Sequence, residues 1–356
     1  MGTLLGYDDV RRQSEGVWKQ FGESKWIPYS QINCRLPNRR DPNELRNCGV
    51  GKFAVLAAMG ESLQEAIPLL KKHREKFDLV TCDKGFPILM AQGLKPDFVQ
   101  LCDCNIPYKW LEPWVEQTDG VKLLATTYAN VEWTTRWKGP TYFYVNKDAL
   151  DSQKRFLPIL GNPDSSKFTG LEDKIAAMSD APVRVIPAGS NVSNAMLTFM
   201  VGADETNRAN WAGYEHYFLT GYDYCWRPKG SGLSCKTGSY YAFEDPEPKR
   251  YYMNHRTMLD INGDIVQTSE NLLFSAKWMF SYLAAFDLPV TNCSGRGILD
   301  VRRQASLEKS LEKCSPSREK REAIFAAAKD IQMAQAMRLS AEARLDSARR
   351  SLWGKG

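Results

Sequence analysis

The stretch that decides the fold runs from Lys52 to Asp103 and reads KFAVLAAMGESLQEAIPLLKKHREKFDLVTCDKGFPILMAQGLKPDFVQLCD. Short apolar runs occur in it at residues 53–58, 79–82 and 98–102. Helical patterns at 63–72 and 86–92 separate these runs. Because this alternation is typical of βαβ units, we predict an α/β fold with a mainly parallel, Rossmann-like sheet flanked by helices.

Each of these apolar runs leads to a residue that suits a ligand site. Gly60, Asp83 and Asp103 follow the ends of three successive predicted strands. In parallel α/β sheets, ligands bind outside the carboxyl ends of the strands. We therefore expect Gly60, Asp83 and Asp103 to lie at one edge of the sheet, beside a bound ligand.

The same stretch carries a resemblance to a known family. Its parts are Met59-Gly60-Glu61-Ser62-Leu63, Asp83 before a short helix, and Gly93-Leu94-Lys95-Pro96-Asp97-Phe98-Val99 before the strand that ends at Asp103. In this order they resemble the MptE-like family, which includes archaeal 6-hydroxymethylpterin diphosphokinases and the Maf glycosyltransferases of bacterial flagellin. The family's first loop usually reads Gly-Pro-Ser-Leu, whereas this chain has Glu61 in place of the proline. A carboxylate that faces a phosphate is electrostatically unfavourable.

The resemblance extends over roughly residues 50–310. Further strands are predicted at 121–125, 141–145, 183–186 and 217–224, with a closing strand from Val290. Asn262-Gly263 predicts a tight turn, and Thr268 to about Ala285 an amphipathic helix. The polar segment 146–182 and the segment 225–250, rich in Gly, Pro and aromatic residues, are interpreted as excursions that cover the site. Long loops of this kind are usually lids or binding loops.

A second chemical motif is Pro187-Ala188-Gly189-Ser190-Asn191-Val192-Ser193-Asn194, between a predicted strand and an apolar helix. Gly189 allows close backbone approach, and Ser190, Asn191 and Ser193 are able to cap the helix while N–H groups point at a ligand. An ordinary capped helix in the core explains the same residues. In the resembled family, a Gly-Ser segment at this place binds the nucleotide side of the substrate.

The nucleotide-binding candidates share a place at a strand end or a helix start. They are Gly60, Ser62, Asp83, Gly189, Ser190, Asn191, Ser193 and Asn292. The last of them belongs to the closing strand and Gly-rich turn, which also resemble the family. Such a set suits ribose hydroxyls and phosphates, with Mg²⁺ as a possible bridge between the phosphates. No residue is singled out as a metal ligand.

Transfer to a hydroxyl group usually needs a general base, and three residues are catalytic candidates. Asp103 and Asp223 end predicted strands, and His255 follows the long loop. For the aspartates, a strand-end cap or a turn is the alternative role. The other two histidines have structural explanations: His73 is expected on a solvated helix face, and His216 precedes an apolar strand.

Three functions remain open from the sequence. The first is a Maf-like glycosyltransferase that moves a sugar from a nucleotide-sugar, of CMP type or another, to a hydroxyl of a macromolecular acceptor. The second is an MptE-like diphosphokinase that uses ATP and a pterin alcohol. The third is a binding or structural module of the same fold. The long aromatic and basic loop favours a large acceptor and therefore the first function.

We expect three regions: an N-terminal extension (1–49), the α/β catalytic domain (50–312) and a helical C-terminal segment (313–356). In the extension, a helix is predicted from Val10 to Phe21, and Pro37 to Pro42 is interpreted as a solvated loop. Aromatic side chains of the extension are expected to pack onto the domain. The C-terminal helix is either an oligomerisation helix or one that packs on its own domain.

Composition narrows the range of partners. The formal charge of +5 is concentrated in the C-terminal segment, so charge does not require a nucleic-acid partner. The nine cysteines form no Cys-x-x-Cys pair, which argues against a zinc site and for free thiols in a reducing cytoplasm. No window approaches a transmembrane helix in length and hydrophobicity, so we expect no membrane partner and a cytoplasmic location.

Overall fold

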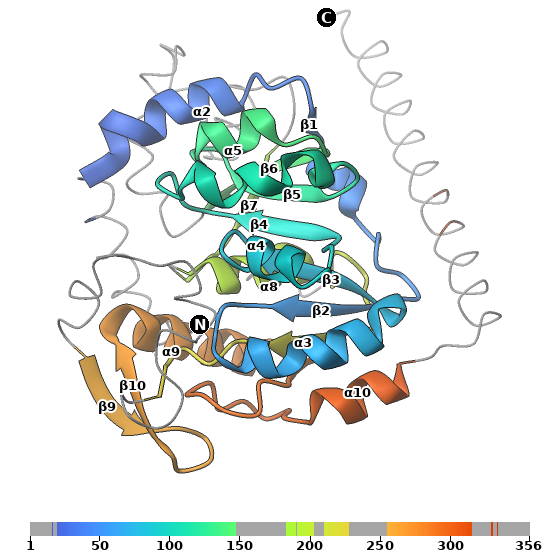
Figure 1. Ribbon diagram of the computed structural model, residues 1–356, viewed down its shortest axis with the longest axis vertical. Coiled ribbons are helices and arrows are strands. Elements are labelled where there is room, and N and C mark those ends of the chain that lie inside the picture. The colour runs from blue at the N-terminus through green and yellow to red at the C-terminus, as the bar shows by residue number, and fades with distance from the viewer. Residues whose placement is uncertain are drawn as a thin grey trace, which may run out of the picture.

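The computed structural model describes residues 16, 20–146, 183–189, 191–202, 210–227, 255–314, 329 and 333 of the 356-residue chain. Its centre is a nine-stranded sheet in the order β1-β6-β5-β4-β3-β2-β8-β11, with β7 also paired to β6 (Figure 1). The strands are β1 (Arg39–Arg40), β2 (Phe53–Ala57), β3 (Phe77–Cys82), β4 (Phe98–Leu101), β5 (Lys122–Thr126), β6 (Thr141–Asn146), β7 (Arg184–Ile186), β8 (His216–Thr220) and β11 (Val290–Asn292). Every pairing in this sheet is parallel, which confirms the predicted α/β fold.

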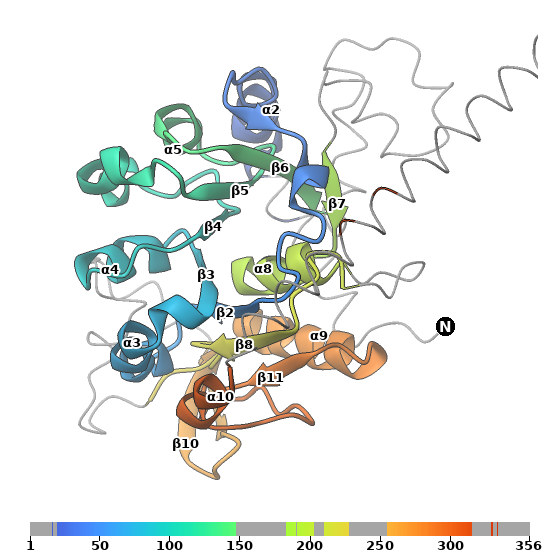
Figure 2. The same ribbon diagram turned by 90° about the vertical axis from the view of Figure 1, so that its right-hand side faces the viewer.

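Helices cover both faces of the sheet. They are α2 (Ile27–Asn33), α3 (Ser62–Lys72), α4 (Gly85–Ala91), α5 (Val131–Arg136), α8 (Val192–Val201), α9 (Glu270–Ala285) and α10 (Leu307–Lys313). Figure 2 shows α3, α4 and α5 on one side of the strands and α8 and α9 on the other. Crossover helices on both faces are what parallel strands require, since a parallel pair needs a long connection.

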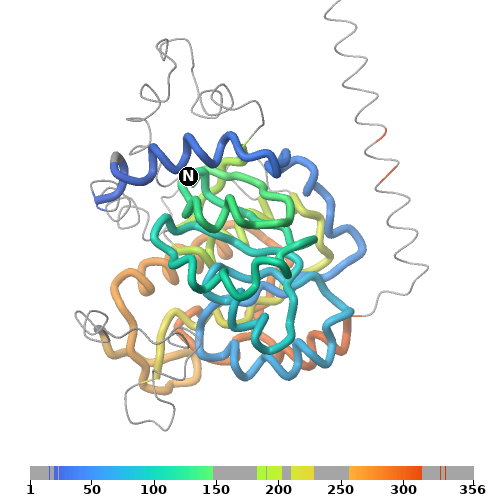
Figure 3. Tube along the Cα trace, turned by 45° about the horizontal axis from the view of Figure 1, so that its top comes forward, coloured from blue at the N-terminus to red at the C-terminus, as the bar shows by residue number. Residues whose placement is uncertain are grey.

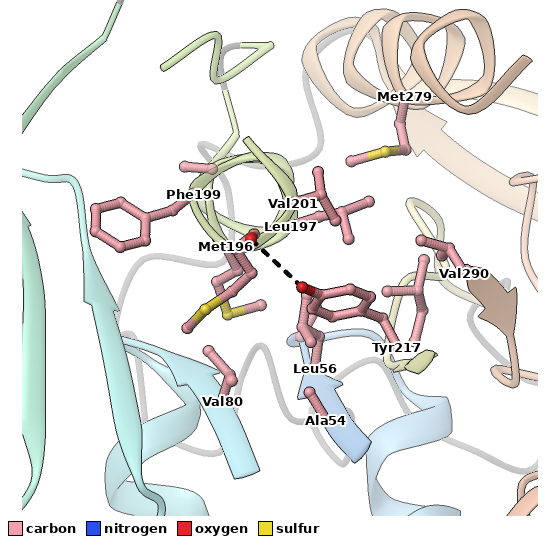
Figure 4. Close-up of a cluster of buried hydrophobic side chains, with 14 of the residues drawn as sticks. Ala54, Leu56, Val80, Met196, Leu197, Phe199, Val201, Tyr217, Met279 and Val290 are labelled. Atoms are coloured by element: carbon pink, nitrogen blue, oxygen red, sulfur yellow. Dashed lines mark hydrogen bonds between the residues drawn. The ribbon is translucent and has the colours of Figure 1, made fainter. Parts of the chain in front are cut away.

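The alternation of side chains along β2 explains why this strand is apolar throughout. Ala54 and Leu56 join the buried cluster around α8, shown in Figure 4 with Met196 and Leu197 of that helix. The intervening residues, Val55 and Ala57, join the cluster around α3. Both faces of β2 are therefore core faces, which is why the sequence shows a continuous apolar run there instead of alternation.

The direction in which the chain adds strands reverses at β2. From β2 the chain builds β3, β4, β5 and β6 outward in one direction. It then returns to place β8 on the other side of β2, with Phe53 opposite His216 and Ala57 opposite Thr220. Such a reversal is a topological switch point, and the crevice at the carboxyl ends of the two strands is where ligands bind in open α/β sheets.

The N-terminal segment is attached closely to this sheet (Figure 3). On α2, Asn33 donates to the carbonyls of Thr127 (2.8 Å) and Ala129 (2.9 Å) and accepts from the hydroxyl of Thr134 (2.6 Å). The ring of Trp26 stacks on that of Tyr128, with centroids 4.2 Å apart. Most of the helix predicted over residues 10–21 lies outside the described residues, although Gly16, Gln20 and Phe21 are helical.

The prediction of a solvated loop between Pro37 and Pro42 was wrong at its centre. Arg39–Arg40 forms β1, which pairs in parallel with β6 so that Arg39 lies opposite Thr141. Two residues at a sheet edge are too few to produce a strand pattern in the sequence. The flanking prolines are compatible with β1 because edge strands tolerate proline.

A separate antiparallel hairpin, β9 (His255–Leu259) and β10 (Ile265–Ser269), precedes α9. Its turn contains Asn262-Gly263, as predicted, and Gly263 has a φ of +84°. Residues 147–182 of the excursion predicted at 146–182, residues 228–250 of the segment predicted at 225–250 and most of the C-terminal segment lie outside the described residues. Within the described ranges, no helix is both long and apolar enough to cross a membrane.

Candidate functional site

The loops that follow β2 and β8 are bonded directly to each other at the switch point. The backbone N–H of Gly60 donates to the carbonyl of Gly221 (2.7 Å). Asp223 accepts from the backbone N–H of Ser62 through Oδ2 (2.8 Å) and from the Ser62 hydroxyl through Oδ1 (2.5 Å). The Ser62 hydroxyl in turn accepts from the N–H of Gly221 (3.0 Å). Three of the residues predicted for the site, Gly60, Ser62 and Asp223, therefore lie in one hydrogen-bonded cluster.

This close approach requires glycine at position 60. A Cβ atom there would lie 2.5 Å from Cγ of Asp223 and 2.6 Å from the carbonyl oxygen of Gly221. Both atoms belong to the β8 loop. Its backbone is held in place because the carbonyl of Thr220 accepts from the N–H of Ala58 and the N–H of Gly221 donates to the Ser62 hydroxyl. Gly60 is therefore needed for the packing of two loops, a role distinct from the ligand contact that the sequence predicts.

Asp223 lies at the base of this cluster and is only 1% exposed. Burial raises the pKa of its carboxyl group to about 7, although the two hydrogen bonds from Ser62 act in the opposite direction. The negative charge of Glu61 adds to the increase. Both carboxylate oxygens bind Ser62, so Asp223 holds the start of α3 in place. Because its side chain is buried, a substrate in solvent does not reach this carboxylate.

Glu61 is the residue that departs from the family's usual loop, and it is surrounded by charged groups. Its Oε2 lies 3.7 Å from Nη1 of Arg296 and 4.0 Å from Nε of Arg227. Arg296 and Arg227 also form ion pairs with Glu65, one turn further along α3. Burial raises the pKa of Glu61 and lowers that of Arg296. Neither arginine was among the residues predicted for the site; the one signal for them in the sequence was the unexplained acid at position 61.

Asp83 and Asp103 follow the ends of the neighbouring strands β3 and β4 but have different surroundings. Asp83 is 3% exposed and accepts from the N–H of Lys84 (2.7 Å). Burial raises the pKa of Asp83 to about 6, and the charge of Asp103 contributes to the increase. Asp103 is exposed and accepts from the N–H of Asn105 through Oδ1 (2.7 Å). The two carboxylates thus interact electrostatically, and Asp103 is the one that solvent reaches.

The second predicted motif starts α8 and contacts the β8 loop. Asn191 caps the helix, its Oδ1 accepting from the N–H (2.8 Å) and the hydroxyl (2.6 Å) of Ser193. Gly189 has a φ of +53° and packs against Trp278 of α9. The hydroxyl of Tyr222 donates to the carbonyl of Ser193 (2.8 Å). The start of α8 is therefore connected to the segment that carries Asp223; Ser190 lies outside the described residues.

Asn292 ends β11 and organises the Gly-rich turn after it. Its amide donates to the carbonyl of Leu299 (3.1 Å), and its Oδ1 accepts from the N–H of Ser294 (3.1 Å). The Ser294 hydroxyl accepts from the N–H of Tyr222 (3.0 Å). Asn292 thus links the β11 loop to the β8 loop. His255 is the first residue of β9, and its side chain lies outside the described residues.

Comparison with known proteins identifies the family. A sequence model described as 6-hydroxymethylpterin diphosphokinase MptE-like matches residues 35–228, more than half of the chain. The chain belongs to the MptE-like family. The match begins before β1, so it includes the N-terminal edge strand as well as the switch point.

Two individual proteins resemble parts of this MptE-like chain. An uncharacterised protein of Treponema pallidum (strain Nichols) is 30% identical over 89 residues, which are 25% of this chain and 41% of that protein. The solved structure of the MAf glycosyltransferase from Magnetospirillum magneticum AMB-1 matches with a TM-score of 0.50 and 15% identity. That match covers 86% of this chain and 42% of the glycosyltransferase chain. The chain therefore has a glycosyltransferase-like fold and spans less than half the length of either relative.

The described residues of this MptE-like domain provide carboxylates but no complete metal site. No three His, Cys, Asp or Glu side chains among them come together as a group able to hold a metal ion. Mg²⁺, however, usually binds one or two carboxylates together with substrate phosphates and water. Asp83 and Asp103 are two carboxylates that follow the ends of the adjacent strands β3 and β4.

Proposed function

We propose that this MptE-like chain is a glycosyltransferase that moves a sugar from a nucleotide-sugar donor to a hydroxyl of a macromolecular acceptor. The observation that carries the proposal is the exposed carboxylate of Asp103 beside the buried Asp83, at the same edge of the sheet as the start of α3 and the β8 loop. A solvent-accessible carboxylate at the carboxyl edge suits a general base for an acceptor hydroxyl. The glycosyltransferase-like fold supports the choice of reaction.

In this proposal the donor lies along the carboxyl edge, with its nucleotide toward the start of α8. Asn191 orders the first turn of that helix and leaves the helix N-terminus directed at the donor, which favours negatively charged groups. Asp103 accepts the proton of the acceptor hydroxyl. In the alternative role, Asp103 and Asp83 would hold Mg²⁺, which would supply charge neutralisation for the leaving phosphate, and His255 would be the base.

Asp223 takes a positioning role in this scheme. Both of its oxygens bind Ser62, so the carboxylate fixes the loop of β2 against that of β8. We propose Asp103 and His255, the first residue of β9, as the two candidates for the base.

A second function rests on one observation, the family description that names a 6-hydroxymethylpterin diphosphokinase. That reaction uses ATP and a pterin alcohol. The two functions differ in the ligand that stabilises the protein. A thermal shift with a CMP-, UDP- or GDP-sugar supports the glycosyltransferase, and a shift that requires ATP with the pterin supports the diphosphokinase. A chain that responds to none of them is a binding or structural module.

Substitution of the base candidates tests the chemistry. Asp103→Asn keeps the Oδ1 acceptor for Asn105, so the protein should stay folded while transfer is abolished. His255→Ala should slow transfer by about a hundredfold if His255 is the base. The matched control is Asp119→Asn, which should keep wild-type turnover. Asp119 is exposed and follows the 3₁₀ helix Glu112–Thr118. Wild-type activity in Asp103→Asn would remove Asp103 from the mechanism.

A further inference from the structure

Glu61, Glu65, Arg227 and Arg296 form a compact group of four charges, which we call the charged cluster. Its members come from the carboxyl ends of three adjacent strands. Glu61 follows β2, Arg227 follows β8 and Arg296 follows β11, while Glu65 lies in the first turns of α3. The charged cluster therefore stands at the switch point itself, where open α/β sheets bind their ligands.

The contacts within the charged cluster leave one donor of Arg296 unused, although both arginines pair with Glu65. Nη1 of Arg296 is buried and finds no hydrogen-bond partner among the residues that the structure describes. Oε2 of Glu61 lies 3.7 Å from Nη1, beyond hydrogen-bond distance, while Nη2 of the same guanidinium pairs with Oε1 of Glu65. Arg227 reaches the same oxygen at 4.0 Å. A buried N–H group without an acceptor costs free energy, so Nη1 of Arg296 is a donor that a ligand oxygen would satisfy.

The geometry of the charged cluster suits a ligand richer in acceptor oxygens than one carboxylate. Two arginines from different strands converge on Oε2 of Glu61. Arginine presents a planar fork of donors that matches phosphate oxygens. A diphosphate has enough oxygens for both arginines, including the unpaired Nη1 of Arg296.

We propose that Arg227 and Arg296 bind the diphosphate group of a donor of the UDP- or GDP-sugar class, since a CMP-sugar has a single phosphate, and that Glu61 is an internal anion which occupies this site until the diphosphate displaces it. The proposal deepens the glycosyltransferase function and rests on it for the identity of the donor. In the absence of donor, Glu61 and Glu65 neutralise the arginines and hold them at the switch point. When the donor binds, each arginine exchanges carboxylate oxygens for phosphate oxygens and the β2 loop is released from the pair.

The substitution Glu61→Gln separates this role from a structural one. As a competitor, the carboxylate weakens diphosphate binding, so its removal should strengthen binding of inorganic pyrophosphate by about tenfold. As a structural group only, its removal would leave binding unchanged or weaken it. Isothermal titration with pyrophosphate measures the difference in either direction.

Arg296→Met should weaken pyrophosphate binding by about tenfold or more, and Arg296→Lys by less, because lysine retains the charge but not the fork. The matched control is Arg303→Met. Arg303 also forms an ion pair, with Asp287 (2.9 Å), but near the start of β11, at the opposite edge of the sheet. The Arg303→Met variant should bind pyrophosphate as tightly as the wild type does. If Arg296→Met does not fold, the opposite sign expected for Glu61→Gln still decides the question.

Two results overturn the inference: pyrophosphate binding that is the same in Glu61→Gln as in the wild type, or weaker. Its failure differs from the failure of the proposed function. Tighter pyrophosphate binding in Glu61→Gln without transfer from any nucleotide-sugar retains the diphosphate site and removes the glycosyltransferase. Transfer from a nucleotide-sugar, together with pyrophosphate binding that is the same in Glu61→Gln as in the wild type, retains the glycosyltransferase and removes the diphosphate site.

Discussion

Asp83 illustrates at the scale of one residue how the fold changes the chemistry of a carboxyl group. Its neighbour Asp103 also follows a strand end, and yet one group is buried and the other exposed. Burial raises the pKa of Asp83 to about 6, with a further increase from the charge of Asp103. In the unfolded chain the same group titrates at about 4. The folded state therefore binds the proton of Asp83 more tightly than the unfolded state does.

This difference predicts the sign of a pH dependence. Below about pH 4 both states hold the proton, and the stability associated with it is complete. As the pH rises toward 6, the unfolded state ionises first, so the free energy of unfolding falls. Asp83→Asn should reduce this slope, measured by urea denaturation between about pH 4.5 and 6.5. Asp119→Asn is the exposed control and should keep the wild-type slope; a slope unaltered in Asp83→Asn would contradict the assignment.

At the scale of one element, α8 depends on its N-cap. Its residues are almost all buried, so little of the helix is available to solvent for satisfying its first N–H groups. Oδ1 of Asn191 accepts from the N–H and the hydroxyl of Ser193. The opposite end of α8 is closed by Gly202 in the left-handed conformation, with a φ of +58°. The helix is therefore capped by side chain at one end and by glycine at the other.

Asn191→Ala should lower the free energy of unfolding by about 1 kcal/mol, the usual cost of losing an N-cap. Asn191→Asp keeps an acceptor in the same place and should restore most of the loss. Urea denaturation gives both values. Equal destabilisation in the two variants would contradict this, because it would mean that the stabilisation comes from the NH₂ group of Asn191 and not from the hydrogen bond that Oδ1 accepts. If the start of α8 binds the nucleotide, Asn191→Ala should also lose transfer.

At the scale of the whole molecule, the N-terminal segment and the sheet form a continuous structure. Leu45 is buried in the main core, and Trp26 stacks on Tyr128 at the carboxyl edge. Asn33 satisfies the carbonyls of Thr127 and Ala129, which follow β5. A loop that needs a side chain from another segment for its backbone hydrogen bonds is held in shape by that segment. The N-terminal segment should therefore unfold together with the sheet.

Asn33→Ala tests this cooperativity. It removes a fully buried amide that makes hydrogen bonds to Thr127, Ala129 and Thr134, so we expect a loss of about 2–4 kcal/mol. Calorimetry should still show one transition, shifted to lower temperature. Gln31→Ala, an exposed substitution on the same helix, is the control and should leave that transition in place. A separate early transition in Asn33→Ala would mean that the N-terminal segment unfolds independently.

The sequence was sufficient for the elements of the sheet because each strand and helix has its own local pattern. The apolar run at 53–58 predicted a strand, and Asp83 and Asp103 marked where the next two strands end and therefore the carboxyl edge of the sheet. The pairing of β2 with β8 was not predictable, because the two strands are far apart in the sequence and no local pattern links them. β1 was missed because two residues carry no periodicity.

The candidate site was predictable in outline and not in its detailed roles. Gly60, Ser62 and Asp223 were all selected, but the hydrogen bonds from Ser62 to Asp223 appear only when β8 lies beside β2. Asp83 and Asp103 are equivalent in the sequence and differ only in burial, which depends on the whole fold. Arg296 was missed because an arginine in a Gly-rich turn has no distinctive pattern until Glu61 is placed next to it.

The pairing of β2 with β8 has a consequence for the synthesis of the chain. Strands β2 to β6 leave the ribosome first and are able to pair with one another, while β8 follows much later. Translation adds about 5–20 residues per second, so the free edge of β2 stays unpaired for a time on the order of ten seconds. That edge belongs to an apolar strand with both faces destined for the core, the kind of edge that pairs with other chains. The segment that completes the switch point is thus also the segment that protects the nascent protein from aggregation.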